Sequence, residues 1–101
     1  MPKTPRSDSA QLVVRGEVDI AVVEGLLAEA ERSMDASRSR LEVDLHDVTF
    51  IDSSGLGALV QIQRNASERG ISMVLTRPSD ATRRLLELSG LDHVFTIAPL
   101  P

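Results

Sequence analysis

Apolar residues change their spacing along this chain in strict alternation, and this alternation limits the fold more than any other feature. Short runs rich in Val, Ile and Leu, typical of strands, alternate with longer segments in which apolar residues recur every three or four positions, typical of helices. The predicted order is strand, helix, strand, helix, strand, helix, strand. Strands joined by crossovers of helical length pair in parallel and are covered by helices. The sequence therefore predicts an α/β fold: a single small domain with a mostly parallel or mixed sheet of about four or five strands and helices packed on it.

The residues that start and stop each element give its approximate bounds. A short strand at 12–14 ends at Gly16, and Asp19 caps the helix that follows. Gly25 lies inside that helix, where glycine costs about 1 kcal/mol relative to alanine, so we expect close packing there. The remaining predicted elements are a strand at 40–51 with one polar face (Glu42, Asp44, His46), a helix at 56–70, a strand at 71–76, a helix at 77–90, and a strand at 93–97 entered at His93.

Composition and charge exclude several classes of protein. Phe50 and Phe95 are the only aromatic residues, so the core must be aliphatic and no stacking platform for bases is available. The net charge of −4 argues against a direct nucleic-acid partner, which needs Lys and Arg gathered on one face. The chain has no cysteine, which excludes disulfides and thiolate chemistry, and no apolar run long enough for a membrane helix. We expect a cytoplasmic protein without a membrane partner, as a monomer or weak dimer, with residues 1–10 as a flexible arm or irregular edge strand and 11–101 as the domain.

The octapeptide FIDSSGLG at 50–57 interrupts a strand pattern with a polar, glycine-containing turn. In the simplest interpretation Asp52, Ser53 or Ser54 caps the next helix. A nucleophile elbow needs glycine two positions before its serine, and a phosphate-binding P-loop needs a lysine after its last glycine; neither pattern is present. His46 is expected to end the upstream strand, but no third group orients it as a base, and two histidines are too few for a metal site. We therefore expect no enzyme activity, metal or cofactor.

A serine at the start of a helix allows one further interpretation, a phosphorylation switch. The positive end of the helix dipole and the free N–H groups there accommodate a phosphate. Phosphorylation adds a charge of about −1.5 to −2, which weakens a partner interface through like-charge repulsion and desolvation. Capping and switching are compatible, because neighbouring residues can perform them.

Three stretches carry a resemblance to a known family: RGEVD at 15–19, DVTFIDSSGLGALV at 47–60 and RPSDATRRLLELSGL at 77–91. In order, spacing and identity they resemble the signature segments of the STAS domain, in particular of the bacterial anti-sigma factor antagonists. The resemblance covers about residues 11–97, and DSSGLG after a strand is its most specific part. Family members usually begin with an additional strand. The short, proline-bearing MPKTPRSDS suggests that this strand is truncated or irregular here.

This resemblance implies a mode of action. Such antagonists bind an anti-sigma factor, often a serine kinase with a GHKL-type ATP site, and so release a sigma factor. The kinase phosphorylates the serine after the motif aspartate, and a PP2C-type phosphatase restores the complex. Carried to this sequence, Ser53 is the phosphoacceptor, with Ser54 the less favoured alternative. Asp52 shapes the loop, Ser54 serves the helix cap, and Asp19 matches a family aspartate near the phosphorylated loop.

The predicted helix after this loop also offers a surface for the partner. The face opposite its apolar stripe carries Gly57, Gln61, Arg64 and Glu68; for Arg64 and Glu68 the alternative interpretation is a merely solvated helix face. Gly55 and Gly57 favour a close backbone approach, since glycine is otherwise a poor choice at a helix start. The main rival function keeps the fold without the switch: a STAS structural subunit of a lipid-transport or stress-sensing assembly.

Overall fold

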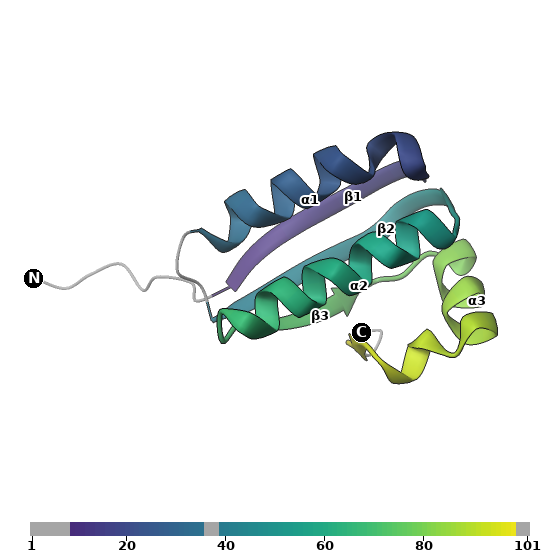
Figure 1. Ribbon diagram of the computed structural model, residues 1–101. Coiled ribbons are helices and arrows are strands. Elements are labelled where there is room, and N and C mark those ends of the chain that lie inside the picture. Colours follow the sequence, from purple (N-terminus) through teal and green to yellow (C-terminus); the bar gives the residue numbers. More distant parts are fainter. Residues whose placement is uncertain (1–8, 36–38, 99–101) are drawn as a thin grey trace, which may run out of the picture.

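Four strands lie side by side in one sheet, in the order in which the chain reaches them, in this computed structural model, which describes residues 9–35 and 39–98 (Figure 1). Every neighbouring pair of strands is parallel. The elements are β1 (Ser9–Val18), α1 (Ile20–Met34), β2 (Arg40–Ile51), α2 (Ser53–Glu68), β3 (Ser72–Thr76), α3 (Asp80–Ser89), the 3-10 turn η1 (Leu91–His93) and β4 (Thr96–Ile97). The predicted alternation and the small parallel sheet are confirmed.

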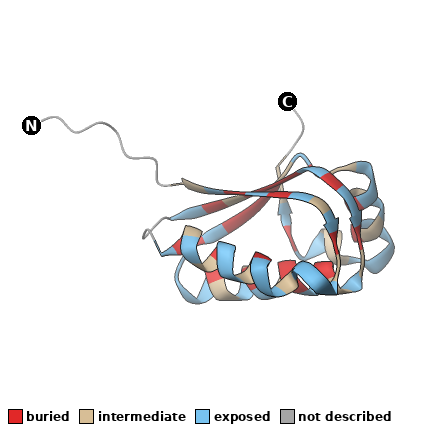
Figure 2. Ribbon diagram, turned by 90° about the horizontal axis from the view of Figure 1, so that it is seen from above, coloured by how far each residue is buried: buried red, intermediate tan, exposed pale blue. Residues whose placement is uncertain are grey.

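Helices α1 and α2 cover one face of the sheet, and α3 lies at the end of the molecule where β2 finishes (Figures 1 and 2). When parallel strands lie in the sheet in the same order as in the sequence, right-handed crossovers place the connecting helices on the same face, as seen for α1 and α2 (Figure 2). The core between the layers is aliphatic except for Phe95, and its fully buried members include Leu41, Leu45, Leu59 and Ile62. In the described part of the chain, no helix combines the length and apolar character that crossing a membrane requires.

Strand β1 is longer than the sequence predicts. Gly16, expected to end the strand, lies within it at φ 74°, and the pairing with β2 shifts register at two points, between Val13 and Arg15 and between Gly16 and Glu17. A glycine with positive φ inside a strand is typical of a β-bulge. The strand therefore continues to Val18 and takes in Ser9 and Ala10. The other residues of the predicted arm, 1–8, lie outside the described part of the chain, as does any additional first strand there.

Two further local predictions are wrong. A Cβ at Gly25 would meet no atom within 4 Å, so this glycine faces open space on α1 instead of a close neighbour. His93 does not enter a strand, because it ends the 3-10 turn that follows Gly90, and β4 contains only Thr96 and Ile97. Gly90 adopts a left-handed conformation at φ 77°, so the chain turns sharply after α3 and then needs η1 to return to the sheet.

The predicted polar face of β2 is only partly exposed. Asp44 is 7% exposed, because Arg77, just beyond β3, covers it and donates to its Oδ2 at 2.8 Å. The His46 backbone N–H donates to the Asp44 Oδ1 at 3.0 Å. The hydrogen bond from Arg77 is the main reason that the pKa of Asp44 lies below its ordinary value of 3.8, with the His46 N–H and the charge of Arg77 adding to it against the opposing effect of burial. Asp44 is therefore a charged anchor that ties β2 to the end of β3.

This anchor predicts a loss of stability in acid. A carboxylate whose pKa is lower in the folded than in the unfolded chain contributes stability above its unfolded pKa and loses it as the pH falls through the folded pKa. We expect the stability advantage of the wild type over Asp44→Asn, measured by urea unfolding, to shrink as the pH is lowered from about 5 to about 3. A constant difference across that range would show that the ion pair with Arg77 contributes nothing to folding.

Candidate switch and docking site

Asp52 is the residue that caps α2. Its extended backbone precedes the first helical residue, and its Oδ1 accepts a hydrogen bond from the Gly55 N–H at 3.1 Å. Its own N–H donates to the Val18 carbonyl at 3.3 Å, which fixes the loop to the end of β1. The prediction that Ser54 serves the cap is therefore wrong: Ser54 already lies inside the helix, at its second position.

Ser53 occupies the first helical position of α2 and its side chain is exposed, whereas Ser54 is half-buried. The N–H groups of the first turn of an α-helix have no acceptor within the helix. Asp52 accepts only that of Gly55, and no described residue accepts from the backbone N–H of Ser53 or Ser54. Of the two serines, Ser53 offers the more accessible hydroxyl at a helix end that tolerates negative charge.

Gly55 makes the close backbone approach that the sequence suggests, but against the protein's own β1. A Cβ at this position would lie 2.7 Å from the Val18 carbonyl oxygen and 2.8 Å from Cγ1 atoms of Val18 and Ile51. Gly55 is buried, so it sets the distance between α2 and the sheet and cannot itself contact a partner. A partner-contacting role for this residue is not supported by its position.

Asp19 lies at the same edge of the sheet as the loop. Asp19 and Asp52 directly follow the paired residues Val18 and Ile51, so α1 and α2 begin side by side. Asp19 caps α1 as predicted, with its Oδ1 accepting from the Ala21 N–H at 3.0 Å. This places a second carboxylate at the edge of the sheet that carries Ser53.

The predicted partner face of α2 is exposed, and its residues divide between a groove toward β3 and a polar network toward α1. Gly57, Gln61, Arg64 and Glu68 are all exposed. A Cβ at Gly57 would meet nothing within 4 Å, so the expected close approach is absent there within the chain. Arg64 and Glu68 line an open groove of about 600 Å³ that runs from α2 to β3 and includes Met73 and Val94.

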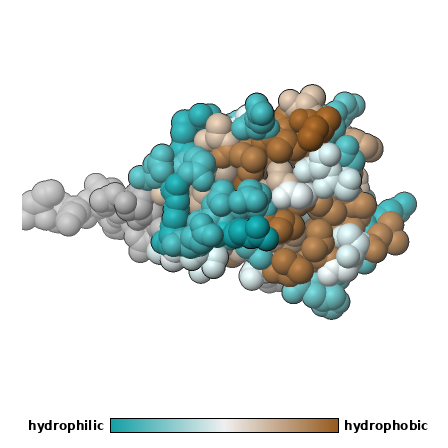
Figure 3. Space-filling model, in the orientation of Figure 1, coloured by the Kyte–Doolittle hydropathy of each residue, from teal (hydrophilic) through white to brown (hydrophobic). Residues whose placement is uncertain are grey.

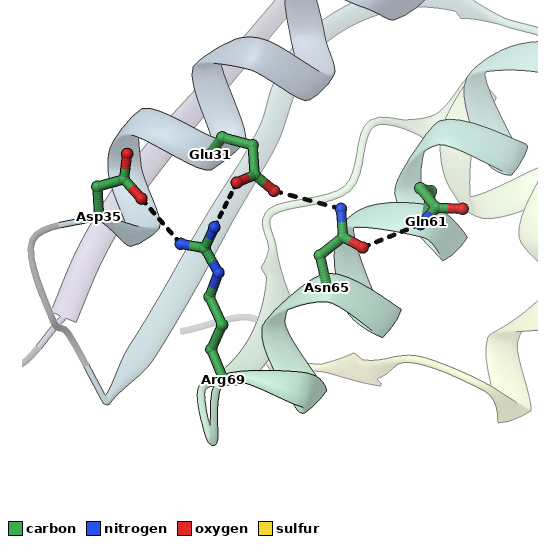
Figure 4. A network of polar contacts seen from close by, with 5 residues as sticks. All are labelled: Glu31, Asp35, Gln61, Asn65 and Arg69. Atoms are coloured by element: carbon green, nitrogen blue, oxygen red, sulfur yellow. Dashed lines mark hydrogen bonds and ion pairs between the residues drawn. The ribbon is translucent and has the colours of Figure 1, made fainter.

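Gln61 belongs instead to a polar network that joins α2 to α1 (Figure 4). Its Nε2 donates to the Asn65 Oδ1 at 2.9 Å, and Asn65 donates to Glu31 at 3.4 Å. Arg69 binds both Glu31 and Asp35. Exposed ion pairs are individually weak, but a connected network fixes the relative position of two helices better than one pair. Gln61 is thus held in place at the α1 side of the helix.

His46 does not lie beside the loop that carries Ser53. His46 lies in the middle of β2, not at its end as predicted, and four strand residues lie between it and Ile51, a distance of roughly 16 Å along the strand. Within residues 9–35 and 39–98, no group of three His, Asp or Glu residues is placed to hold a metal ion.

Exposed apolar residues near the loop were missed by sequence reasoning. Ile20 is 73% exposed at the start of α1, Leu88 is 78% exposed on α3, and Phe50 is half-exposed just before the loop. Figure 3 shows apolar surface gathered over the end where α1 and α2 begin and toward α3, while the opposite end is hydrophilic. A sequence signal for the α3 surface was available, because Ala81, Leu85 and Leu88 recur at the spacing of one helix face. The buried residues of α3, Thr82 and Leu86, lie on a different face.

Comparison with known proteins decides the family. The family model described as "Mlab, STAS domain" matches residues 3–99. The chain belongs to the STAS domain family. This STAS chain is 30% identical over 91 residues to the anti-sigma-B factor antagonist of Listeria monocytogenes. The aligned region covers 90% of this chain and 80% of that relative.

Solved structures agree with this assignment. The crystal structure of an anti-sigma factor antagonist from Mycobacterium paratuberculosis is 28% identical to this STAS chain, with a TM-score of 0.76 over 96% of the chain and 82% of that protein. The phosphorylated form of the Bacillus cell fate determinant SpoIIAA is 21% identical, with a TM-score of 0.68 over 96% of the chain and 88% of that protein, and is similar in fold alone. The predicted family and the predicted fold are both confirmed.

Proposed function

We propose that this STAS chain is an anti-sigma factor antagonist, a binding protein and not an enzyme, whose partner is an anti-sigma factor with GHKL-type serine kinase activity. The partner phosphorylates Ser53, which ends the complex, and a PP2C-type phosphatase restores it. The observation that carries the proposal is the placement of Ser53: an exposed hydroxyl at the first position of α2, on a loop fixed by Asp52 and Gly55. The 30% identity to an anti-sigma-B factor antagonist supports it.

The electrostatics of the loop fit a switch that acts on the interface while leaving the fold unchanged. A phosphate on Ser53 lies at the positive end of the α2 dipole, which stabilises it within the chain. Toward a partner, the same phosphate adds to the negative charge of Asp52 and of Asp19 at the same sheet edge. A partner surface that accepts the neutral hydroxyl then meets concentrated negative charge, which costs binding free energy.

A second candidate function is a STAS subunit that is not switched by phosphorylation. The matching family model is described as "Mlab, STAS domain" and not as an anti-sigma factor antagonist, so membership of the family does not by itself require the switch. Under this alternative, Ser53 serves only as the first residue of the helix, and the exposed apolar residues contact a permanent partner. The two functions differ in whether a kinase modifies Ser53.

The test is phosphorylation by a cognate kinase. Each GHKL-type anti-sigma factor of the source organism is purified and incubated with this chain and ATP, and the phosphate is located by intact mass and peptide mapping. We expect one phosphate per chain on Ser53. Ser53→Ala should abolish transfer, and the matched variant Ser54→Ala should keep it, because Ser54 is half-buried within the helix.

The outcomes separate the two functions. Transfer to Ser53 with a kinase that also binds the chain supports the antagonist. Absence of binding and transfer with every anti-sigma factor tested contradicts it. Transfer that persists in Ser53→Ala but is lost in Ser54→Ala would move the phosphoacceptor by one residue and overturn the assignment of the switch.

A further inference from the structure

An open cleft lies between the end of β2 and helix α3, beside the loop that carries Ser53. It encloses about 430 Å³ and is lined by Ile51, Asp80, Ala81, Arg84, Leu85 and Leu88. Ile51 forms the wall shared with the loop, because its Cγ1 also lies 2.8 Å from where a Cβ of Gly55 would be. The cleft is therefore next to the first turn of α2.

The α3 wall of the cleft is an apolar helix face that covers the core only in part: Leu85 is half-buried and packs against the core, whereas Leu88 is exposed. Ala81, Leu85 and Leu88 recur at the spacing of one helix face, while Thr82 and Leu86 are the buried residues of α3. A face that only contacts water has no need of leucine, yet Leu88 is 78% exposed. Exposed apolar clusters rimmed by charge are typical of interaction sites.

Charge at the rim indicates the chemistry of the occupant. Two charged residues line the cleft: Asp80 in the first turn of α3, where the helix dipole favours a carboxylate, and Arg84, with which no described residue forms an ion pair. An arginine beside an apolar cleft pairs most strongly with a carboxylate brought in by a partner. The complementary surface is thus an apolar side chain next to an Asp or Glu.

The cleft lies close enough to Ser53 for one partner interface of ordinary size to cover both. A specific interface covers about 800 Å² on each protein, a patch with a radius of roughly 16 Å. Ile51 and Ser53 are two residues apart, so their Cα atoms are separated by at most about 7.6 Å. A partner that binds around Ser53 with an interface of this size also covers the cleft.

We infer that the cleft between β2 and α3 is a second docking point for the anti-sigma factor, which inserts an apolar side chain against Leu85 and Leu88 and pairs a carboxylate with Arg84. This inference rests on the proposed function. It assigns α3 a role in partner binding. Part of the binding free energy then comes from contacts outside the phosphorylated loop, so the kinase can hold its substrate while Ser53 enters the active site.

The experiment measures, by isothermal titration calorimetry, how the cognate anti-sigma factor identified by the kinase test binds variants of the full chain. Leu88→Glu is expected to weaken binding tenfold or more. Val13→Glu is the matched control, since Val13 is also an exposed apolar residue but lies on β1 and does not line the cleft. Arg84→Glu should also weaken binding tenfold or more, and its control is Arg83→Glu, which changes the neighbouring charge outside the cleft.

The wild type separates failure of this inference from failure of the proposed function. If no anti-sigma factor binds the wild type, the proposed function fails, and this inference fails with it. If the wild type binds but Leu88→Glu and Arg84→Glu each lose less than fivefold affinity relative to their controls, the inference alone is overturned. Circular dichroism shows whether Leu88→Glu folds. If it does not, Leu88→Ala takes its place in the comparison of affinities. A change in oligomeric state with unchanged partner affinity would assign the cleft to a second copy and overturn the inference.

Discussion

Complete phosphorylation of Ser53 is expected to weaken the affinity of this chain for its anti-sigma factor by a hundredfold or more. The phosphate adds about 1.5 to 2 negative charges at an exposed position beside Asp52. Within an interface of ordinary size these charges must lose water and face the partner, and a penalty of about 2.8 kcal/mol already corresponds to a hundredfold change. Isothermal titration calorimetry of the phosphorylated and unphosphorylated chains measures the difference directly.

Two variants serve as controls for this effect. Ser53→Ala keeps a neutral residue at the position and should bind like the unphosphorylated wild type, even after incubation with kinase and ATP. Ser53→Asp carries about half the charge of a phosphate and should fall between the two forms. Circular dichroism should be the same for all of them, because the start of α2 tolerates the negative charge. Equal affinity of the phosphorylated and unphosphorylated chains would contradict the electrostatic switch.

The order of elements and the family could be predicted from the sequence because both depend on local patterns. Helix periodicity, the cap at Asp19 and the DSSGLG motif are all contained in short stretches of chain. The start of α2 could not be predicted in the same way, since Asp52, Ser53 and Ser54 are all good caps. Pairing with Val18 holds β2 in the sheet as far as Ile51, and this tertiary contact selects Asp52 as the next residue free to cap.

Other errors have the same origin in contacts between distant parts of the chain. Asp44 looks like a solvent-facing strand residue until Arg77, 33 positions later, covers it. Gly25 and Gly55 are both glycines in helices, but only Gly55 lies against a backbone carbonyl, that of Val18, because the start of α2 lies beside the end of β1 in space. The cleft beside α3 was missed because Leu88 cannot be told from a core residue when its helix is considered alone, whereas in the structure it is exposed.

Replacing Gly55 with Ala is expected to destabilise the protein by about 1–3 kcal/mol, the usual cost of extra volume in a packed site. The new methyl group would lie 2.7 Å from the Val18 carbonyl oxygen, a backbone atom that cannot move away without shifting β1. The start of α2 must move instead, which weakens the hydrogen bond from the Gly55 N–H to Asp52 and displaces Ser53. Thermal unfolding should show a lower Tm, by about 4–8 °C for each kcal/mol in a domain of this size.

Gly57→Ala is the matched control, and the sign of its effect is expected to be opposite. It lies two residues further along the same helix, where a Cβ would meet nothing within 4 Å, so alanine should stabilise α2 by about 0.5–1 kcal/mol through its better helix propensity. The two variants also separate folding from binding. Gly55→Ala should lower both stability and phosphorylation of Ser53, whereas Gly57→Ala should raise stability while weakening the anti-sigma factor complex, if the exposed face of α2 contacts the partner. A Gly55→Ala variant as stable as the wild type would show that α2 can slide on β1, and the loop would then lack the fixed position on which the switch depends.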